Sequence, residues 1–478
     1  MQTNYLIQLI RTLSLEEQKQ LVLYIESPFF NRSKFKGNMK KLFMLMVDEV
    51  QPLDKKALFS KLFPKEIESV SKLDKNMTEL GKLIRSFLMT NYYWRSDNAF
   101  HQNLDWAGLL RQRAMETRYL RALSQLKELQ AAVEYESTEY YLNEILYEQE
   151  VLVWENYNNR VRGGLNLPAL FHKLEIYYQL NRLEWLNRLL LQQKVVQVNL
   201  PKQLDFLSRE IFISESLLEQ SASLRINYQI YQALKSEVPD VKDFYALTDL
   251  LKQHEKKIEP DAMQEFYTFL RNTCTLLINF GHSEMLAVLF TLQKDNLEKG
   301  YFYHKGKISH SAFGNIVTVA TKVGAQEWAL GFMEEHKTRI IGNEETNDFY
   351  KLTMASYFFS VKDFESALDW IPGAPQDTLY LFRARRLKLK AQFELDSELL
   401  PYEMDAFKMM LSRAAQKLIS PQFRELQANF INFLYQVVHT ATSDKPRLRR
   451  LAQRISDKSP VSEKDWLLEK INQMLLLG

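Results

Sequence analysis

Apolar side chains recur along most of this chain at every third or fourth position, the spacing that places them on one face of an α-helix. The pattern is clearest at 350–372, where one apolar stripe runs up to Phe359 and a second begins at Phe364. Lys362 lies between the stripes, and Pro372 ends the second, because proline cannot continue the hydrogen-bond ladder of a helix. The stretch therefore predicts two short helices joined by a tight turn.

Small residues lie on both of these predicted helices. Ala355 and Ala367 are twelve residues apart, and two helices approach closely only where small residues face each other. The order of small residues, aromatics and a closing proline resembles a tetratricopeptide repeat. Lys362 stands where the repeat often has glycine, the usual early tryptophan is absent, and Pro372 comes early.

Three further stretches repeat the pattern less strongly. They are 174–190 with Asn181 at the turn, 274–290 with Gly281, and 317–333 with Gly324. The steps of 43 and 38 residues from Gly281 to Gly324 to Lys362 exceed the 34 of the repeat, so we expect an irregular array. The resemblance implies a right-handed superhelix of stacked helix pairs, whose concave surface binds peptides or proteins.

Helix-start and helix-stop signals divide the chain further. Ser14 and Glu17 have the spacing of a capping box, Asp54 and Ser69 are predicted to begin helices, and Asp261 is predicted as a cap with Gln264 in the box position. We expect Pro28 to end a helix, 296–309 to be irregular, and a last helix to start within 462–465.

We expect three regions: an N-terminal helical region (1–97), long helices leading into the array (98–163), and the helical repeats with a capping helix (164–478). The clearest break in the first half is the sequence RGG at Arg162–Gly164. The SPFFN helix end and the WLLEKI last helix also resemble a class of uncharacterised bacterial helical proteins, a resemblance that implies no particular function.

Composition supports an all-α fold. Among 478 residues, 46% are hydrophobic and only 14 are glycine and 13 proline, which disfavours turn-rich β folds. A single cysteine, Cys274, excludes an internal disulfide and fits a reducing compartment. The N-terminus does not read as a signal peptide and no apolar run predicts a membrane span, so we expect a cytoplasmic protein.

Motifs for chemistry are missing from the sequence. It has no glycine-rich phosphate loop, no HExxH, no GxSxG and no CxxC. His304 and His310 are the closest histidine pair, without an acidic residue between them, so we expect no metal site. Cys274 lies in an apolar run and is expected to be a buried thiol rather than a nucleophile. We therefore predict no cofactor and no enzymatic activity.

Positive charge is concentrated near the C-terminus. Residues 380–460 contain 15 Lys and Arg against 8 Asp and Glu, a net charge of +7, whereas the whole chain has +3. Arg383, Arg386 and Lys390 fall on one predicted helical face, and Arg447, Arg449 and Arg450 form a second group. We expect these six residues either to form a face for an anionic partner, phosphate or acidic peptide, or to be solvated helix surface.

Three functional hypotheses remain open. The first is a non-enzymatic interaction or scaffold protein that binds a protein or peptide on a concave helical surface. The second is a nucleic-acid-associated regulator, using the basic C-terminal third or the N-terminal helices; 56–88 faintly resembles the helical part of a winged helix-turn-helix, without a predicted wing. The third, an enzyme whose catalytic groups are far apart in sequence, is disfavoured by the missing motifs.

Overall fold

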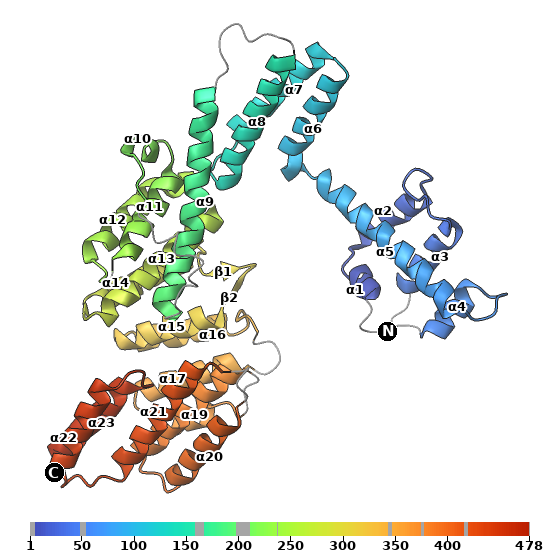
Figure 1. The fold of residues 1–478 in the computed structure, drawn as a ribbon. Helices are drawn as coiled ribbons and strands as arrows, with labels where there is room; N and C mark the ends of the chain where they lie inside the picture. Colours follow the sequence, from blue (N-terminus) through green and yellow to red (C-terminus); the bar gives the residue numbers. More distant parts are fainter. Residues whose placement is uncertain are drawn as a thin grey trace. The chain divides into compact units, whose positions relative to one another are not determined.

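The computed structural model describes residues 5–47, 54–157, 167–196, 211–236, 238–342, 347–373, 377–414 and 419–477. These ranges contain 23 α-helices and one hairpin of two-residue strands, which confirms the all-α fold class (Figure 1). Contacts divide the chain into two compact units, 1–181 and 182–478. The predicted break at 162–164 lies outside the described residues. No helix in the described ranges has both the length and the apolar character needed to cross a membrane.

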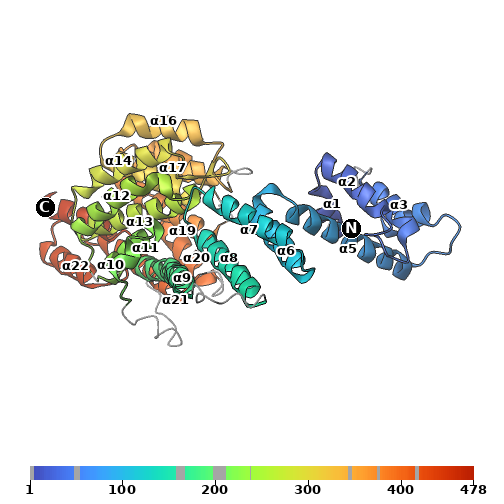
Figure 2. The ribbon, with the colours of Figure 1, turned by 90° about the horizontal axis from the view of Figure 1, so that it is seen from above.

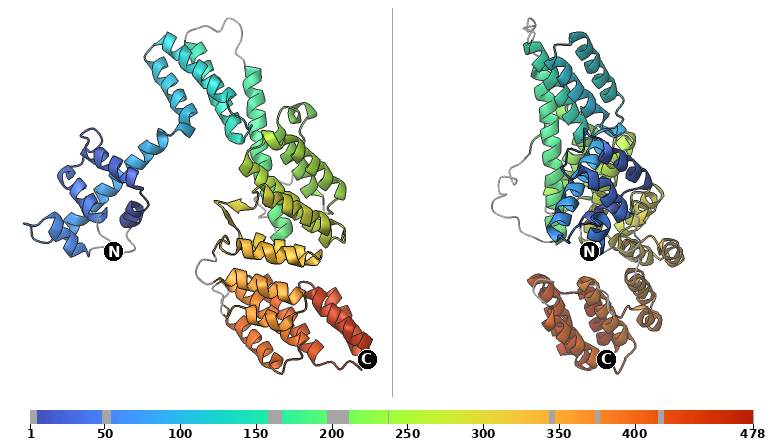
Figure 3. Two further views of the ribbon diagram at one scale, coloured as in Figure 1. Left: turned by 180° about the vertical axis from the view of Figure 1, so that it is seen from behind. Right: turned by 90° about the vertical axis from the view of Figure 1, so that its right-hand side faces the viewer.

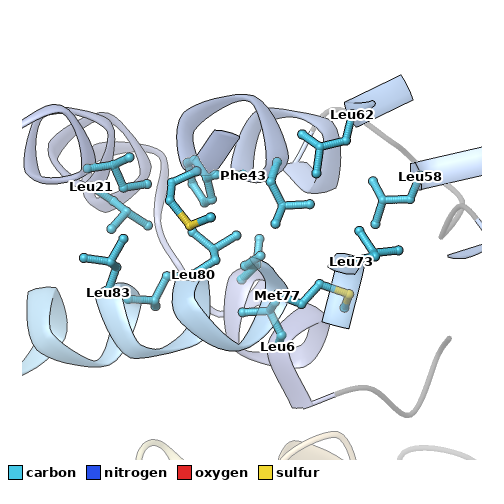
Figure 4. Packing of buried hydrophobic residues seen from close by; sticks show 14 of the residues in the cluster. Leu6, Leu21, Phe43, Leu58, Leu62, Leu73, Met77, Leu80 and Leu83 are labelled. Atoms are coloured by element: carbon cyan, nitrogen blue, oxygen red, sulfur yellow. The ribbon is translucent and has the colours of Figure 1, made fainter. Parts of the chain in front are cut away.

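The N-terminal helices of the first unit form a bundle around one apolar core. They are α1 (Tyr5–Arg11), α2 (Leu15–Glu26), α3 (Lys36–Val47), α4 (Lys55–Leu62) and α5 (Val70–Tyr93). Leu21 and Phe43 meet Leu80 and Leu83 of α5 in this core, and Leu58 of α4 closes one end (Figure 4). The predicted capping box is confirmed: Ser14 Oγ accepts from the Glu17 N–H at 3.2 Å, and Glu17 accepts from the Ser14 N–H at 2.7 Å. Asp54 and Ser69 cap α4 and α5 as predicted.

A short 3-10 turn and a series of long α-helices complete the first unit. They are η1 (Ser96–Asn98), α6 (Ala99–Gln112), α7 (Glu116–Ala131), α8 (Thr138–Tyr157) and the start of α9 (Leu167–Val196). The predicted turn at Asn181 is wrong, because α9 is one continuous helix of 30 residues. Asn181 Nδ2 donates to the Tyr177 carbonyl at 2.9 Å, a contact that a helix accommodates, and Leu180 and Leu183 continue the buried stripe across the expected turn. No strand follows α5 within described residues 94–157, so a wing is not present there.

The second unit is a succession of helices packed against their neighbours in chain order (Figures 1–3). The first half comprises the rest of α9 from Arg182 on, α10 (Glu215–Leu218), α11 (Ala222–Lys235), α12 (Val241–His254), η3 (Glu255–Lys257), α13 (Pro260–Asn279), α14 (Met285–Glu298), β1 (Tyr303–His304), β2 (Lys307–Ile308), α15 (His310–Lys322) and α16 (Gln326–His336). The second half comprises α17 (Asp348–Ser360), α18 (Phe364–Trp370), α19 (Thr378–Glu394), α20 (Leu400–Arg413), α21 (Pro421–Val438), α22 (Lys445–Asp457) and α23 (Lys464–Leu477).

Three predicted helix pairs are confirmed, and they share one turn geometry. After α13, α15 and α17 a single residue adopts a left-handed conformation: Gly281 (φ 104°), Gly324 (φ 83°) and Lys362 (φ 65°). At each turn this residue donates to a carbonyl three residues back and the next residue donates to one five residues back, which is the Schellman motif. Asp396, 34 residues after Lys362, makes the same turn between α19 and α20.

Two helix-boundary predictions are wrong. Asp261 is not a cap, because α13 already starts at Pro260, whose fixed φ and missing N–H suit the first helical position. The stretch 296–309 is not wholly irregular: α14 runs to Glu298, and Tyr303 and His304 pair with Ile308 and Lys307 in the small hairpin.

Candidate anion-binding groove and basic helices

The predicted cations of α19 are held in ion pairs within the fold. Lys390 Nζ donates to Glu463 Oε2 at 2.7 Å and Arg386 Nε donates to Glu463 Oε1 at 3.3 Å. Arg386 also donates to Gln427 Oε1 at 2.8 Å. The Arg386 and Lys390 side chains are only 14% and 12% exposed. These two predicted site residues therefore join α19 to the start of α23.

The electrostatics of this cluster follow from its burial. Burial by itself would raise the pKa of Glu463, but Lys390 and Arg386 outweigh it and hold that pKa below its ordinary value. Burial lowers the pKa of Arg386, against the opposing effect of Glu463. Lys390 Nζ also lies 4.5 Å from the centre of the Phe359 ring, a cation–π distance.

The other α19 cations are partly engaged. Lys388 Nζ lies 2.6 Å and Arg385 Nη1 3.6 Å from the Glu403 carboxylate. Arg383 is half-buried, with no carboxylate within salt-bridge distance among the described residues.

The predicted cations of α22 have a different environment. Arg447, Arg449 and Arg450 are exposed, and within the described ranges none lies within salt-bridge distance of a carboxylate. Leu448 and Leu451 on the opposite face are buried. Arg447 also lies in the first turn of α22, where the helix dipole disfavours a positive charge. The six predicted residues thus form two sets: α19 residues mainly inside the fold, and α22 residues open to solvent.

A groove along α13 was not predicted from the sequence. It consists of two adjoining pockets that share Gln264 and Thr268, and we call it the α13 groove. The first, the α9 pocket, has a volume of about 590 Å³ and lies among α9, α11 and α13. The second, the arginine pocket, has a volume of about 420 Å³ and lies among α13, α14 and α15. Helices from separate parts of the second unit therefore contribute to one surface.

The arginine pocket is named for Arg271, which is only 9% exposed. Its Nη2 donates to Thr268 Oγ1 at 2.8 Å, and its Nη1 donates to the Asn296 side-chain carbonyl. The guanidinium carbon lies 4.0 Å from the centre of the Phe302 ring. No carboxylate within the described residues pairs with Arg271, and burial lowers its pKa to about 10. The guanidinium is therefore oriented by neutral acceptors and a ring, without a counter-charge.

The lining of the arginine pocket is cationic and polar. Lys322 at its rim adds a second positive charge, and no lining residue is acidic. The remaining polar lining includes Asn272, Thr275, Asn279, Ser311, Asn315 and Thr318. The α9 pocket differs, since Glu184, Asp261 and Glu265 line it and its one arginine, Arg188, is paired with Glu265 at 2.7 Å. The two ends of the groove therefore have opposite chemical character.

Each pocket also contains a buried amide oxygen without a donor. Gln293 in the arginine pocket is 4% exposed and Asn187 in the α9 pocket is 7% exposed. Gln293 Oε1 and Asn187 Oδ1 accept no hydrogen bond in the described part of the chain. Such atoms are costly when buried, and a ligand N–H or O–H in the groove would satisfy them.

Two further side chains with potential reactivity, a cysteine and a histidine, are engaged in packing contacts of the fold. Cys274 is fully buried, its thiol donates to the Met285 carbonyl at 3.3 Å, and burial raises its pKa to about 12. His310 stacks on Phe349 with ring centres 4.2 Å apart. The described residues contain no cluster of three or more His, Cys, Asp or Glu that would hold a metal.

Comparison with known proteins identifies no relative of this chain. No family model, curated protein or solved structure matches the chain. The fold and the groove define an all-α protein of packed helical hairpins, with one cationic pocket on α13.

A sequence signal for Arg271 was present but not used. The buried face of α13 follows Met263, Tyr267, Leu270, Cys274 and Leu277 at helical spacing. Arg271 lies four residues after Tyr267 and three before Cys274, so it falls on that apolar face. A charge on a buried stripe is a stronger indication of a site than a dense surface cluster.

Proposed function

We propose that this protein is a non-enzymatic interaction protein that binds an extended segment of a partner protein in the α13 groove. In this proposal the hairpins of the second unit form a right-handed, tetratricopeptide-like superhelix, and the first helices of successive pairs line its inner face. The partner and the protein meet in the cytoplasm.

The observation that carries the proposal is the continuity of the two pockets through Gln264 and Thr268. An extended chain advances about 3.3 Å per residue, so a segment of several residues would cross both pockets. Amide and hydroxyl side chains from several helices suit the backbone groups of such a segment, because each backbone N–H and C=O needs a partner when it loses water.

A library of random peptides displayed on phage tests this function. Peptides selected on the full-length protein should lose binding to Thr268→Trp, which fills the junction of the pockets, and keep binding to Thr291→Trp. Both threonines are exposed and each hydroxyl donates to the carbonyl four residues back, at 2.8 and 3.0 Å, so the two variants are matched in exposure and helical position. Thr268 differs in that its hydroxyl also accepts from Arg271 Nη2. Equal peptide binding by both variants, or no enrichment at all, would contradict the proposal.

A second candidate function, nucleic-acid binding, is favoured by the exposed arginines of α22. Arg447, Arg449 and Arg450 are available to phosphates without breaking an ion pair of the described structure. Binding through them would weaken steeply as salt is raised, because phosphate contacts release counterions. A gel shift of DNA or RNA that disappears at high salt would support this function, and no shift at low salt would exclude it.

A further inference from the structure

We propose that the arginine pocket is a carboxylate-binding subsite, in which Arg271 holds the carboxylate of a ligand. As the anchor for a partner's acidic residue it rests on the proposed function, although the binding of the carboxylate itself does not. The proposal depends on three features of the pocket, whose lining has no acidic residue: a buried guanidinium without a counter-charge, N–H donors of that guanidinium that remain available, and an unsatisfied amide oxygen.

The first feature is the charge of Arg271. An arginine that is 9% exposed has lost most of its hydration, and the neutral Asn296 and Thr268 acceptors replace only part of it. Other ion pairs in this unit show the alternative arrangement: Arg386 is also largely buried, but Glu463 accompanies it. The pocket therefore lacks a negative charge to balance Arg271, and a bound anion would supply it.

The second feature is the geometry that remains available. Arg271 donates to one side-chain acceptor from each terminal nitrogen, so further N–H donors of its planar fork have no partner in the described structure. The Phe302 ring, 4.0 Å from the guanidinium carbon, limits its rotation. A fork held in this way suits the two oxygens of a carboxylate, which arginine binds through paired hydrogen bonds.

The third feature distinguishes a carboxylate on a peptide-like ligand from a phosphate. The Gln293 side chain belongs to the lining of the same pocket, and its buried Oε1 accepts no hydrogen bond from the described residues. An acidic amino-acid residue carries an amide N–H close to its carboxylate, so one ligand would satisfy Arg271 and Gln293 together. The dianion of a phosphate monoester offers no donor and would face that oxygen unfavourably. The carboxylate can come from an acidic side chain within a segment or from the free end of a chain.

Four small probes separate these sources in ligand-detected NMR on the full-length protein. N-acetylglutamate α-amide carries only a side-chain carboxylate, N-acetylglutamine only a terminal one, and N-acetylglutamine amide neither. The fourth probe is methyl phosphate, a monoester whose dianion has no O–H donor. We expect at least one carboxylate probe to bind and the neutral amide not to bind. Whichever carboxylate probe binds more tightly shows whether the ligand's carboxylate is a side chain or a chain end. Equal binding of the neutral amide, or phosphate binding as tightly as either carboxylate, would overturn the assignment.

Variants locate the binding. Arg271→Met should weaken the binding of the carboxylate probe by about tenfold or more, because it removes a charge-assisted hydrogen bond. The control Arg121→Met, at an exposed position, should leave the affinity unchanged. Asn315→Asp adds a negative charge to the pocket lining without changing its shape and should also weaken the probe. Asn315 is exposed, so this second variant decides the matter if Arg271→Met fails to fold. Undiminished binding by a folded variant of either kind would refute the subsite.

The outcomes also separate this inference from the proposed function. If peptides bind the groove and Arg271→Met leaves their affinity unchanged, the function stands and the subsite fails. If the small carboxylates bind through Arg271 but Thr268→Trp and Thr291→Trp bind displayed peptides equally, the subsite stands and the interaction function fails.

Discussion

At the scale of single residues, the structure separates arginines that serve the fold from those that remain available. Arg386 is paired with Glu463, as is Lys390, whereas Arg271 is similarly buried without any carboxylate partner among the described residues. Both were part of helical patterns in the sequence, and only their neighbours distinguish them. Substitutions in the Glu463 cluster should therefore change the stability of the protein, and substitutions in the arginine pocket should change ligand binding.

Replacing Glu463 should destabilise the second unit. Glu463→Gln leaves Arg386 and Lys390 without a counter-charge, and we expect a loss of about 2–4 kcal/mol in the free energy of unfolding. The value is discounted from that of a fully buried pair because the Glu463 side chain is 28% exposed. Urea denaturation measures it. Glu425→Gln is the control: its pair with Lys458 is 44–50% exposed, and a similar loss there would contradict the argument.

The same carboxylate should make stability depend on pH in the acid range. The pKa of Glu463 is lowered in the folded protein, so its contribution is complete above the unfolded value of about 4.3 and is lost as pH falls through the folded pKa. The difference in melting temperature between the wild type and Glu463→Gln should therefore be constant near neutral pH and shrink below about pH 4. A difference that persists unchanged into strong acid would show another origin.

At the scale of elements, the helical hairpins are related by their turns more than by their sequences. Four successive hairpins, from α13/α14 to α19/α20, use the same left-handed residue, but glycine occupies it only at Gly281 and Gly324. Lys362 and Asp396 adopt the conformation at a cost that glycine would avoid. This cost offers a direct comparison between equivalent turns.

Exchanging the turn residues should have opposite effects. Lys362→Gly should stabilise the protein by about 0.5–1 kcal/mol, since relief of left-handed strain exceeds the entropy that glycine costs. Gly324→Ala should destabilise it by about 1 kcal/mol. No atom lies within 4 Å of a Cβ added at Gly324, so its effect would come from the backbone alone. Thermal melts measure both changes, and a shift of the same sign in both would disprove the turn argument.

Close packing of α18 should make its buried alanine sensitive to size. Ala367 is fully buried, so Ala367→Leu should cost about 1–3 kcal/mol through overpacking. Asp369→Leu introduces the same side chain at an exposed position of α18 and should change the melting temperature much less. An unchanged melting temperature for Ala367→Leu would show that Ala367 does not lie at a tightly packed helix contact. Ala355, the other small residue, packs with Ala384 and Leu387 of α19.

At the scale of the whole molecule, the apolar core is divided into separate clusters. The cluster of α1–α5 contains only residues from Leu6 to Phe87, and another cluster unites α19–α23 from Phe382 to Ile471. A chain built in this way is expected to unfold in more than one step, because loss of one cluster leaves the others intact. The distribution of charge is equally uneven.

The N-terminal region should fold without the rest of the chain. Residues 1–97 contain every side chain of the α1–α5 cluster, so the fragment should give a helical circular dichroism spectrum and melt cooperatively. Leu80→Ala in the same fragment removes a fully buried side chain and should lower its stability by about 2–5 kcal/mol. A broad, non-cooperative melt of the unmutated fragment would show that this core needs other helices.

The charge on α22 should decide any affinity for nucleic acid. Replacing Arg447, Arg449 and Arg450 together by alanine should abolish or weaken a gel shift, and should reduce its salt dependence by roughly one unit of slope for each phosphate that is no longer neutralised. Arg118, Arg121 and Lys127 are exposed cations of α7, and their triple alanine variant removes the same charge elsewhere. Equal effects of the two triple variants would indicate net charge rather than a site on α22.

The sequence by itself determined the local structure of this protein. Helical periodicity identified the all-α class, the box at Ser14 and the caps at Asp54 and Ser69 fixed helix starts, and Gly281 and Gly324 marked turns, because these signals act between residues a few positions apart. The predicted turn at Asn181 was wrong because asparagine is tolerated in both turns and helices, so this local signal does not decide between them.

Only the tertiary structure decided which charges are available. Arg386 meets Glu463, 77 residues away, and Arg271 meets Asn296, 25 residues away, so neither environment is visible in the local pattern. The α13 groove likewise requires α9, α11, α13, α14 and α15 to lie side by side. A periodic pattern states which face of a helix is turned inward, but the partners on that face come from distant parts of the chain, and they determine whether a charge is neutralised or left to bind.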